Sequence, residues 1–146
     1  MSKKEDFDQF VDDFQAEIDA KDRQDFSAYA LELARNPYNY GSLNPDKNVY
    51  SLAWQGPCGD TMKIYVKIQD ELIIDASYEV DGCATSIMAG SQTMKMIKGK
   101  SLREVKKLED KDVLAALGKF PTESHHCCTL AITTLKKTLE LYSNQQ

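Results

Sequence analysis

Residues 61–83, TMKIYVKIQDELIIDASYEVDGC, decide the fold of this chain. From Met62 to Ile68 every second residue is apolar, which predicts a half-buried strand. From Ile74 to Val80 the same alternation predicts a second strand, with Ile74 among its core-facing residues. Only a short turn around Asp70 separates the two, so they must form an antiparallel hairpin.

This hairpin brings two cysteines to one end of the sheet. With the turn centred near Asp70, Cys58 faces the neighbourhood of Gly82, which directly precedes Cys83. Cys83 and Cys127 also lie at or near predicted helix starts, where partial positive charge stabilises a thiolate. Thiolates bind soft metals. The sequence therefore predicts a metal pocket formed by three cysteines.

The rest of the chain predicts helices around this sheet. A third strand is expected over about 49–54. Helices are expected over 5–20, 26–34, 84–97, a short stretch from Ser101, a stretch capped by Asp110 or Asp112 and ending at Gly118, and 125–141. The expected fold class is α+β, with a small three-stranded antiparallel sheet and helices packed on one face. Residues 1–24 are expected to form an N-terminal amphipathic helical extension, and residues 25–146 the main domain.

Composition excludes several classes of protein. The chain has 146 residues, 42% of them hydrophobic and 28% charged, as in an ordinary globular domain. A net charge of -5 argues against a nucleic-acid partner. No stretch resembles a signal peptide or the ~20 apolar residues of a membrane span, which predicts a cytoplasmic protein. In that reducing compartment four cysteines are expected to be free or metal-bound.

Two further side chains compete for the fourth ligand position. Asp60 lies two residues from Cys58 in the chain, and His126 precedes Cys127. Either His125 or His126 is instead expected to be a solvated helix-start residue. Cys128 points about 100° away from Cys127 on a helix, so core packing is its expected role.

Four motifs carry a family resemblance. In chain order they are Asn36-Pro37-x-Asn39-x-Gly41-Ser42, Cys58-Gly59-Asp60, Gly82-Cys83-Ala84-Thr85-Ser86 and His126-Cys127-Cys128-Thr129-Leu130-Ala131. Together they resemble the U-type iron–sulfur cluster assembly scaffolds, IscU and the N-terminal domain of NifU, over about residues 29–141.

The resemblance implies a function and a role for each site residue. Cys58, Cys83 and Cys127 would ligate a transient [2Fe–2S] cluster, Asp60 would tune its stability and release, and His126 would lie at the site. Cys127 would accept persulfide sulfur. The chain would be a scaffold that binds iron, with zinc sometimes in the empty site, rather than an enzyme.

The resemblance also implies partners. They are a separate cysteine desulfurase of the IscS/NifS type and recipient apoproteins, and a homodimer is left open. Bacterial members often carry a Leu-Pro-Pro-Val-Lys segment that a dedicated Hsp70-type chaperone reads. Here the matching stretch, Phe120-Pro121-Thr122-Glu123-Ser124, keeps one proline, so that chaperone is not expected. Cys128 is an extra cysteine relative to the family pattern.

Two alternatives remain open at this point. One is a zinc-dependent sulfur acceptor like SufU, but those relatives carry an insertion between the second and third cysteines and an arginine before the third. Neither feature is evident between Cys83 and Cys127. The other is a structural zinc domain with no transfer role.

Overall fold

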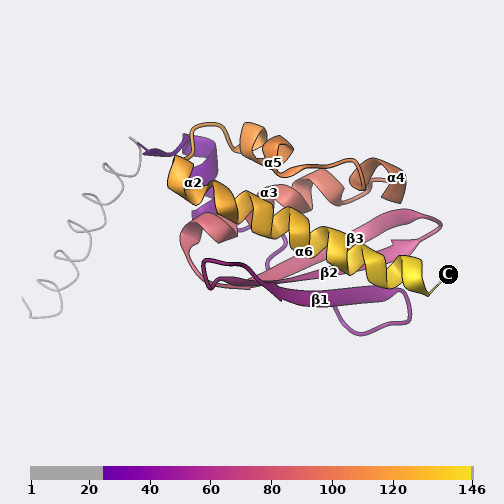
Figure 1. The fold of residues 1–146 in the computed structure, drawn as a ribbon. Coiled ribbons are helices and arrows are strands. Elements are labelled where there is room, and N and C mark those ends of the chain that lie inside the picture. Colours follow the sequence, from indigo (N-terminus) through magenta and orange to yellow (C-terminus); the bar gives the residue numbers. More distant parts are fainter. Residues whose placement is uncertain (1–24, 146) are drawn as a thin grey trace, which may run out of the picture.

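The structure, a computed structural model, describes residues 25–145 (Figure 1). The helix expected over residues 5–20, with the extension to which it belongs, lies outside the described residues. The elements are α2 (Ala28–Arg35), β1 (Val49–Gln55), β2 (Thr61–Gln69), β3 (Leu72–Asp81), α3 (Ala84–Ile97), α4 (Leu102–Val105), α5 (Asp110–Leu117), a 3-10 turn (Thr122–Ser124) and α6 (His125–Asn144).

The three strands form one antiparallel sheet in the order β1-β2-β3. Between β2 and β3, Asp70 and Glu71 have φ angles of 54° and 62°. Two consecutive residues with positive φ form the tight turn that matches the twist of a hairpin. The predicted α+β class and the three-stranded antiparallel sheet are confirmed.

The hairpin contains a bulge that the alternation does not reveal. The register between β2 and β3 shifts between Lys67 and Ile68. Ile73 pairs with Ile68 and is fully buried, whereas Ile74 is 40% exposed. The expectation that Ile74 faces the core is therefore wrong, because the extra residue of a bulge reverses the facing of its neighbours.

The helices lie on one side of the sheet (Figure 1). α6 packs along β1 and β2, α3 packs on β3, and α2 packs on α3. The largest fully buried side chains come from both the sheet and the helices; they include Tyr78, Met62, Ile64, Ile73, Met94, Ile97, Leu117 and Leu135. Within residues 25–145, no helix has both the length and the apolar character that crossing a membrane requires.

One helix start differs from the prediction. The N-cap of α5 is Glu109 rather than Asp110 or Asp112. Asp112 accepts a hydrogen bond from the Glu109 N–H (2.9 Å), which makes it the reciprocal partner in a capping box. The start of α6 agrees with the prediction, and that is the helix end that positions Cys127.

Candidate metal and cluster site

The loop between β1 and β2 closes one end of the sheet. The Gly56 N–H donates to the carbonyl of Asp60 (2.9 Å), and the Gly59 N–H donates to the carbonyl of Gly56 (3.0 Å). Gly59 has a φ of 94°, in the region that side chains disfavour. This compact turn leaves Cys58 exposed and sets Asp60 directly before β2.

Three potential metal ligands converge beyond this end of the sheet. A carboxylate oxygen of Asp60 and the Sγ atoms of Cys83 and Cys127 all lie within 4.8 Å of one another. Cys83 is the N-cap of α3, and Cys127 lies in the first turn of α6. Two helix starts and the β1–β2 loop therefore supply one ligand each. Elsewhere in residues 25–145, no three Asp, Glu, His or Cys side chains are so closely grouped.

The Asp60 carboxylate is held by the start of α3. Its Oδ2 accepts hydrogen bonds from the Ser86 hydroxyl (2.7 Å), the Cys83 N–H (3.3 Å) and the Cys83 thiol (3.2 Å). The hydrogen bond from Ser86 is the main reason that the pKa of Asp60 is lowered, with smaller contributions from Cys83 and the charge of His126, while burial opposes the shift. The carboxylate is thus kept ionised.

Two hydroxyl groups link the thiols. Thr85 Oγ1 lies 3.0 Å from Cys83 Sγ and 3.2 Å from Cys127 Sγ, and Ser86 Oγ lies 3.4 Å from Cys127 Sγ. No role for Thr85 or Ser86 was predicted from the sequence. The available signal was their position, because hydroxyl residues two and three places after a helix-start ligand lie in the same helical turn.

Burial dominates the chemistry of Cys127. This residue is fully buried, and burial raises the pKa of its thiol, although hydrogen bonds with Ser86 and Thr85 act in the opposite direction. In the free thiol, burial therefore opposes the thiolate stabilisation that was expected from the helix start. A bound metal ion reverses this balance, since a coordinating thiol is deprotonated.

Two of the predicted site residues lie outside the group of three. Cys58 is exposed on the β1–β2 turn, and His126 is exposed on the first turn of α6. His126 is close enough for its charge to lower the pKa of Asp60. The structure thus brings Asp60, Cys83 and Cys127 together, with His126 within electrostatic reach.

Cys128 belongs to a different environment. It is 1% exposed, and burial raises its pKa to about 12. It lines a cavity of about 130 Å³ between α5 and α6, together with Asp110, Lys111, Leu114, His125 and Thr129. The expected core packing of Cys128 is confirmed.

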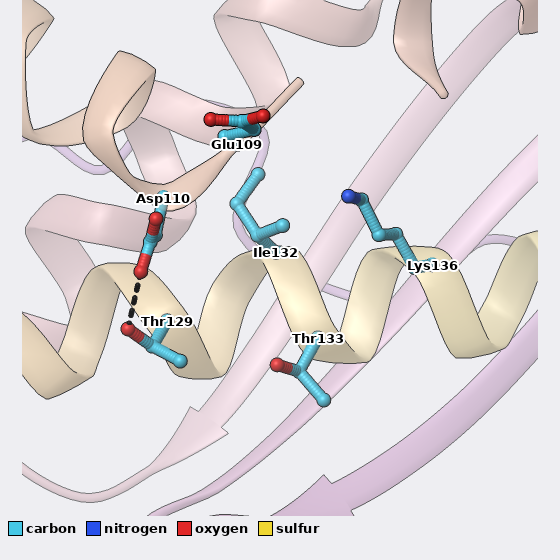
Figure 2. Close-up of a pocket in the computed structure, with 6 residues that line it drawn as sticks. All are labelled: Glu109, Asp110, Thr129, Ile132, Thr133 and Lys136. Carbon is cyan, nitrogen blue, oxygen red and sulfur yellow. Dashed lines mark hydrogen bonds between the residues drawn. The ribbon is translucent and has the colours of Figure 1, made fainter. Parts of the chain in front are cut away.

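A second cavity, of about 220 Å³, lies next along α6 (Figure 2). Its lining residues are Glu109, Asp110, Thr129, Ile132, Thr133 and Lys136. The Thr129 hydroxyl donates to Asp110 (2.8 Å), as the dashed line in Figure 2 marks. Neither of these cavities includes any of the five predicted ligands, so both are separate from the candidate metal site.

Gly82 makes room for the Asp60 carboxylate. A Cβ atom at Gly82 would lie closer than 3.0 Å to Cγ, Oδ1 and Oδ2 of Asp60. Real Cβ atoms do not approach other atoms so closely, so any larger residue forces the carboxylate away from Cys83 and Ser86. This role of Gly82 was also missed from the sequence.

We therefore expect Gly82→Ala to weaken zinc binding. The displaced Asp60 loses its contacts with the start of α3, and misplacing a ligand's support typically costs roughly 10-fold to 100-fold in metal affinity. Competition with a chromophoric chelator measures that loss. In an Asp60→Ala background the same glycine substitution should add nothing. Unchanged zinc affinity in Gly82→Ala, alongside weaker binding by Asp60→Ala, would contradict this role.

The chain was compared with protein families and with known proteins. The family model described as NifU-like N terminal domain matches residues 25–146. The Escherichia coli K12 iron–sulfur cluster assembly scaffold protein IscU is 35% identical over 124 residues, which cover 83% of this chain and 96% of that protein. IscU 1 of Archaeoglobus fulgidus, a protein of the same description, is 34% identical over 117 residues, covering 80% of this chain and 76% of that one.

A solved structure shares the fold. The N-terminal NifU-like protein from Brucella abortus superposes with a TM-score of 0.64 at 19% identity, covering 82% of this chain and 95% of that one. At 19% identity, the similarity shows only that the two proteins share an arrangement of helices and strands.

Proposed function

This chain belongs to the NifU-like N-terminal domain family, and on that premise we propose that it is a scaffold on which an iron–sulfur cluster is assembled and then passed to apoproteins. The chain covers nearly the full length of the Escherichia coli scaffold that it resembles. The cluster is the cargo of this reaction, built from iron and sulfur that other proteins supply.

One observation carries the proposal: two thiols from two helix starts and a carboxylate from the β1–β2 loop lie within 4.8 Å of one another. Each iron of a [2Fe–2S] core takes two protein ligands besides the bridging sulfides, four in total. Cys83, Cys127 and Asp60 supply three of them. Cys58 supplies the fourth from its exposed turn.

The mixed ligand set suits delivery of a cluster. Thiolates are soft ligands that retain iron–sulfur clusters, whereas a carboxylate is harder and prefers harder ions. Asp60 thus forms the weakest bond to iron in the set, and it is the point where solvent or an incoming thiol attacks. His126, whose charge lowers the pKa of Asp60, is available to replace it as a ligand.

Sulfur reaches the scaffold through Cys127. Its thiolate attacks the terminal sulfur of a persulfide on a cysteine desulfurase, forming a new S–S bond as the bond in the donor breaks and the donor leaves as a thiolate. Cys127 touches both hydroxyls and lies beside the other ligands. Sulfur delivered there is already next to the iron ligands.

A zinc-dependent sulfur acceptor is the second candidate. It is favoured by the position of Cys58 outside the group of three, because three protein ligands and one open position are typical of a catalytic zinc site. In that case Cys127 would receive sulfur while a single zinc ion remained bound.

Anaerobic reconstitution with a cysteine desulfurase, ferrous iron and cysteine distinguishes the two. A scaffold gains iron and acid-labile sulfide together, and both then move to an added apo-ferredoxin. A sulfur acceptor gains persulfide and keeps zinc, with no transferable cluster. That second result would refute the scaffold function.

A further inference from the structure

We propose that Ser86 is a positioning residue of the metal-ligand group. Its hydroxyl holds the Asp60 carboxylate beside Cys83 and Cys127, and so sets the affinity of the group for a single divalent ion. The inference rests on the proposed function for the choice of ligands, and it adds a residue that does not itself touch the metal.

Ser86 is a rigid anchor. It lies in the first turn of α3 and is fully buried, so the helix backbone and the surrounding side chains fix its position. Its hydroxyl donates to Asp60 Oδ2 at 2.7 Å, the short range of hydrogen bonds to charged oxygens. The backbone contact to this oxygen, from the Cys83 N–H, is longer at 3.3 Å.

The hydroxyl stands between two ligands but has one proton. Asp60 Oδ2 lies at 2.7 Å and Cys127 Sγ at 3.4 Å from Ser86 Oγ. A hydroxyl donates one hydrogen bond, and the nearer, charged oxygen takes it. Ser86 Oγ also stays 3.4 Å from Cys127 Sγ, so this side chain joins the carboxylate to the thiol.

The hydrogen bonds fix which carboxylate oxygen faces the thiols. The hydrogen bonds that residues 25–145 give to this carboxylate all end on Oδ2, the oxygen that lies 3.2 Å from Cys83 Sγ. Metal-binding carboxylates are usually oriented by such hydrogen bonds. Without Ser86, the carboxylate rotates about its broad terminal torsion and spends less time facing the two sulfurs.

Cobalt(II) titration of the anaerobic full chain tests this role. Thiolate-to-cobalt charge-transfer bands report the two cysteines, and their titration gives the affinity. We expect Ser86→Ala to retain these bands with affinity lowered roughly 10-fold to 100-fold, the usual cost of losing a ligand's hydrogen-bond partner. Thr93→Val is the matched control. Thr93 lies on the same helix, is fully buried and donates to the Ala89 carbonyl (2.8 Å).

A double variant separates positioning from support of the helix. If Ser86 acts through Asp60, then Ser86→Ala changes cobalt affinity by less than about twofold in an Asp60→Ala background, since the two effects are not additive. Two results would overturn the inference. One is that Ser86→Ala lowers cobalt affinity as much in the Asp60→Ala background as in the parent chain. The other is that Thr93→Val lowers cobalt affinity as much as Ser86→Ala does. Parental affinity in Ser86→Ala would overturn it as well. Missing charge-transfer bands in the parent chain would instead refute the ligand set and the proposed function with it.

Discussion

Cys127→Ser is expected to abolish persulfide uptake from a cysteine desulfurase, whereas Cys128→Ser should leave most of it intact. Cys127 Sγ lies in the ligand group, and Thr85, which contacts it, is only partly buried. Cys128 instead lines the cavity between α5 and α6, where none of the five predicted ligands lies.

Mass spectrometry of the desulfurase-treated variants decides between the two thiols. The parent chain should gain one sulfur atom on the peptide that holds both cysteines, Cys128→Ser should gain the same, and Cys127→Ser should gain none. Persulfide that persists in Cys127→Ser and disappears in Cys128→Ser would assign the acceptor role to the wrong residue.

Asp60→Ala is expected to make the assembled cluster longer-lived and slower to leave. Removing the hard ligand removes the point at which water or an incoming thiol attacks the iron. A decay slowed by roughly tenfold corresponds to about 1.4 kcal/mol of added barrier. The opposite expectation follows if Asp60 only anchors the Cys83 N–H, because the loop would then loosen and the cluster would be lost sooner.

Anaerobic decay of the cluster's visible absorbance, with and without a recipient apoprotein, measures this effect. Asp110→Ala is the matched control, since it removes an exposed carboxylate that pairs with Thr129 away from the ligand group. It should decay like the parent chain. Faster decay in Asp60→Ala would leave Asp60 as a structural residue only.

Local sequence patterns were enough to predict most of the fold. The alternation from Met62 to Ile68, the short turn at Asp70 and the helix from Ala84 to Ile97 agree with the structure, because each depends on nearby residues. The facing of Ile74 could not be predicted in this way. Ile73 and Ile74 are equally apolar, and the bulge between the strands decides which of them is buried.

The candidate site, too, could be predicted only in part from the sequence. Hairpin geometry and helix starts predicted a pocket of Cys58, Cys83 and Cys127. The structure groups Cys83 and Cys127 within 4.8 Å, but together with Asp60, while Cys58 stays on its exposed turn. The raised pKa of Cys127 was not predictable, because its burial depends on how α3 packs against α6. The roles of Ser86 and Gly82 likewise emerge only once the carboxylate of Asp60 has a position in space.

The scaffold function requires Cys58 to join Asp60, Cys83 and Cys127 around one cluster. A crystal structure of the anaerobically reconstituted protein tests this arrangement. Iron is expected within about 2.3 Å of the sulfur atoms of Cys58, Cys83 and Cys127, the length of a metal–thiolate bond. An iron–sulfur cluster bound while Cys58 still faces solvent would contradict this arrangement, as would a cluster held at any other part of the chain.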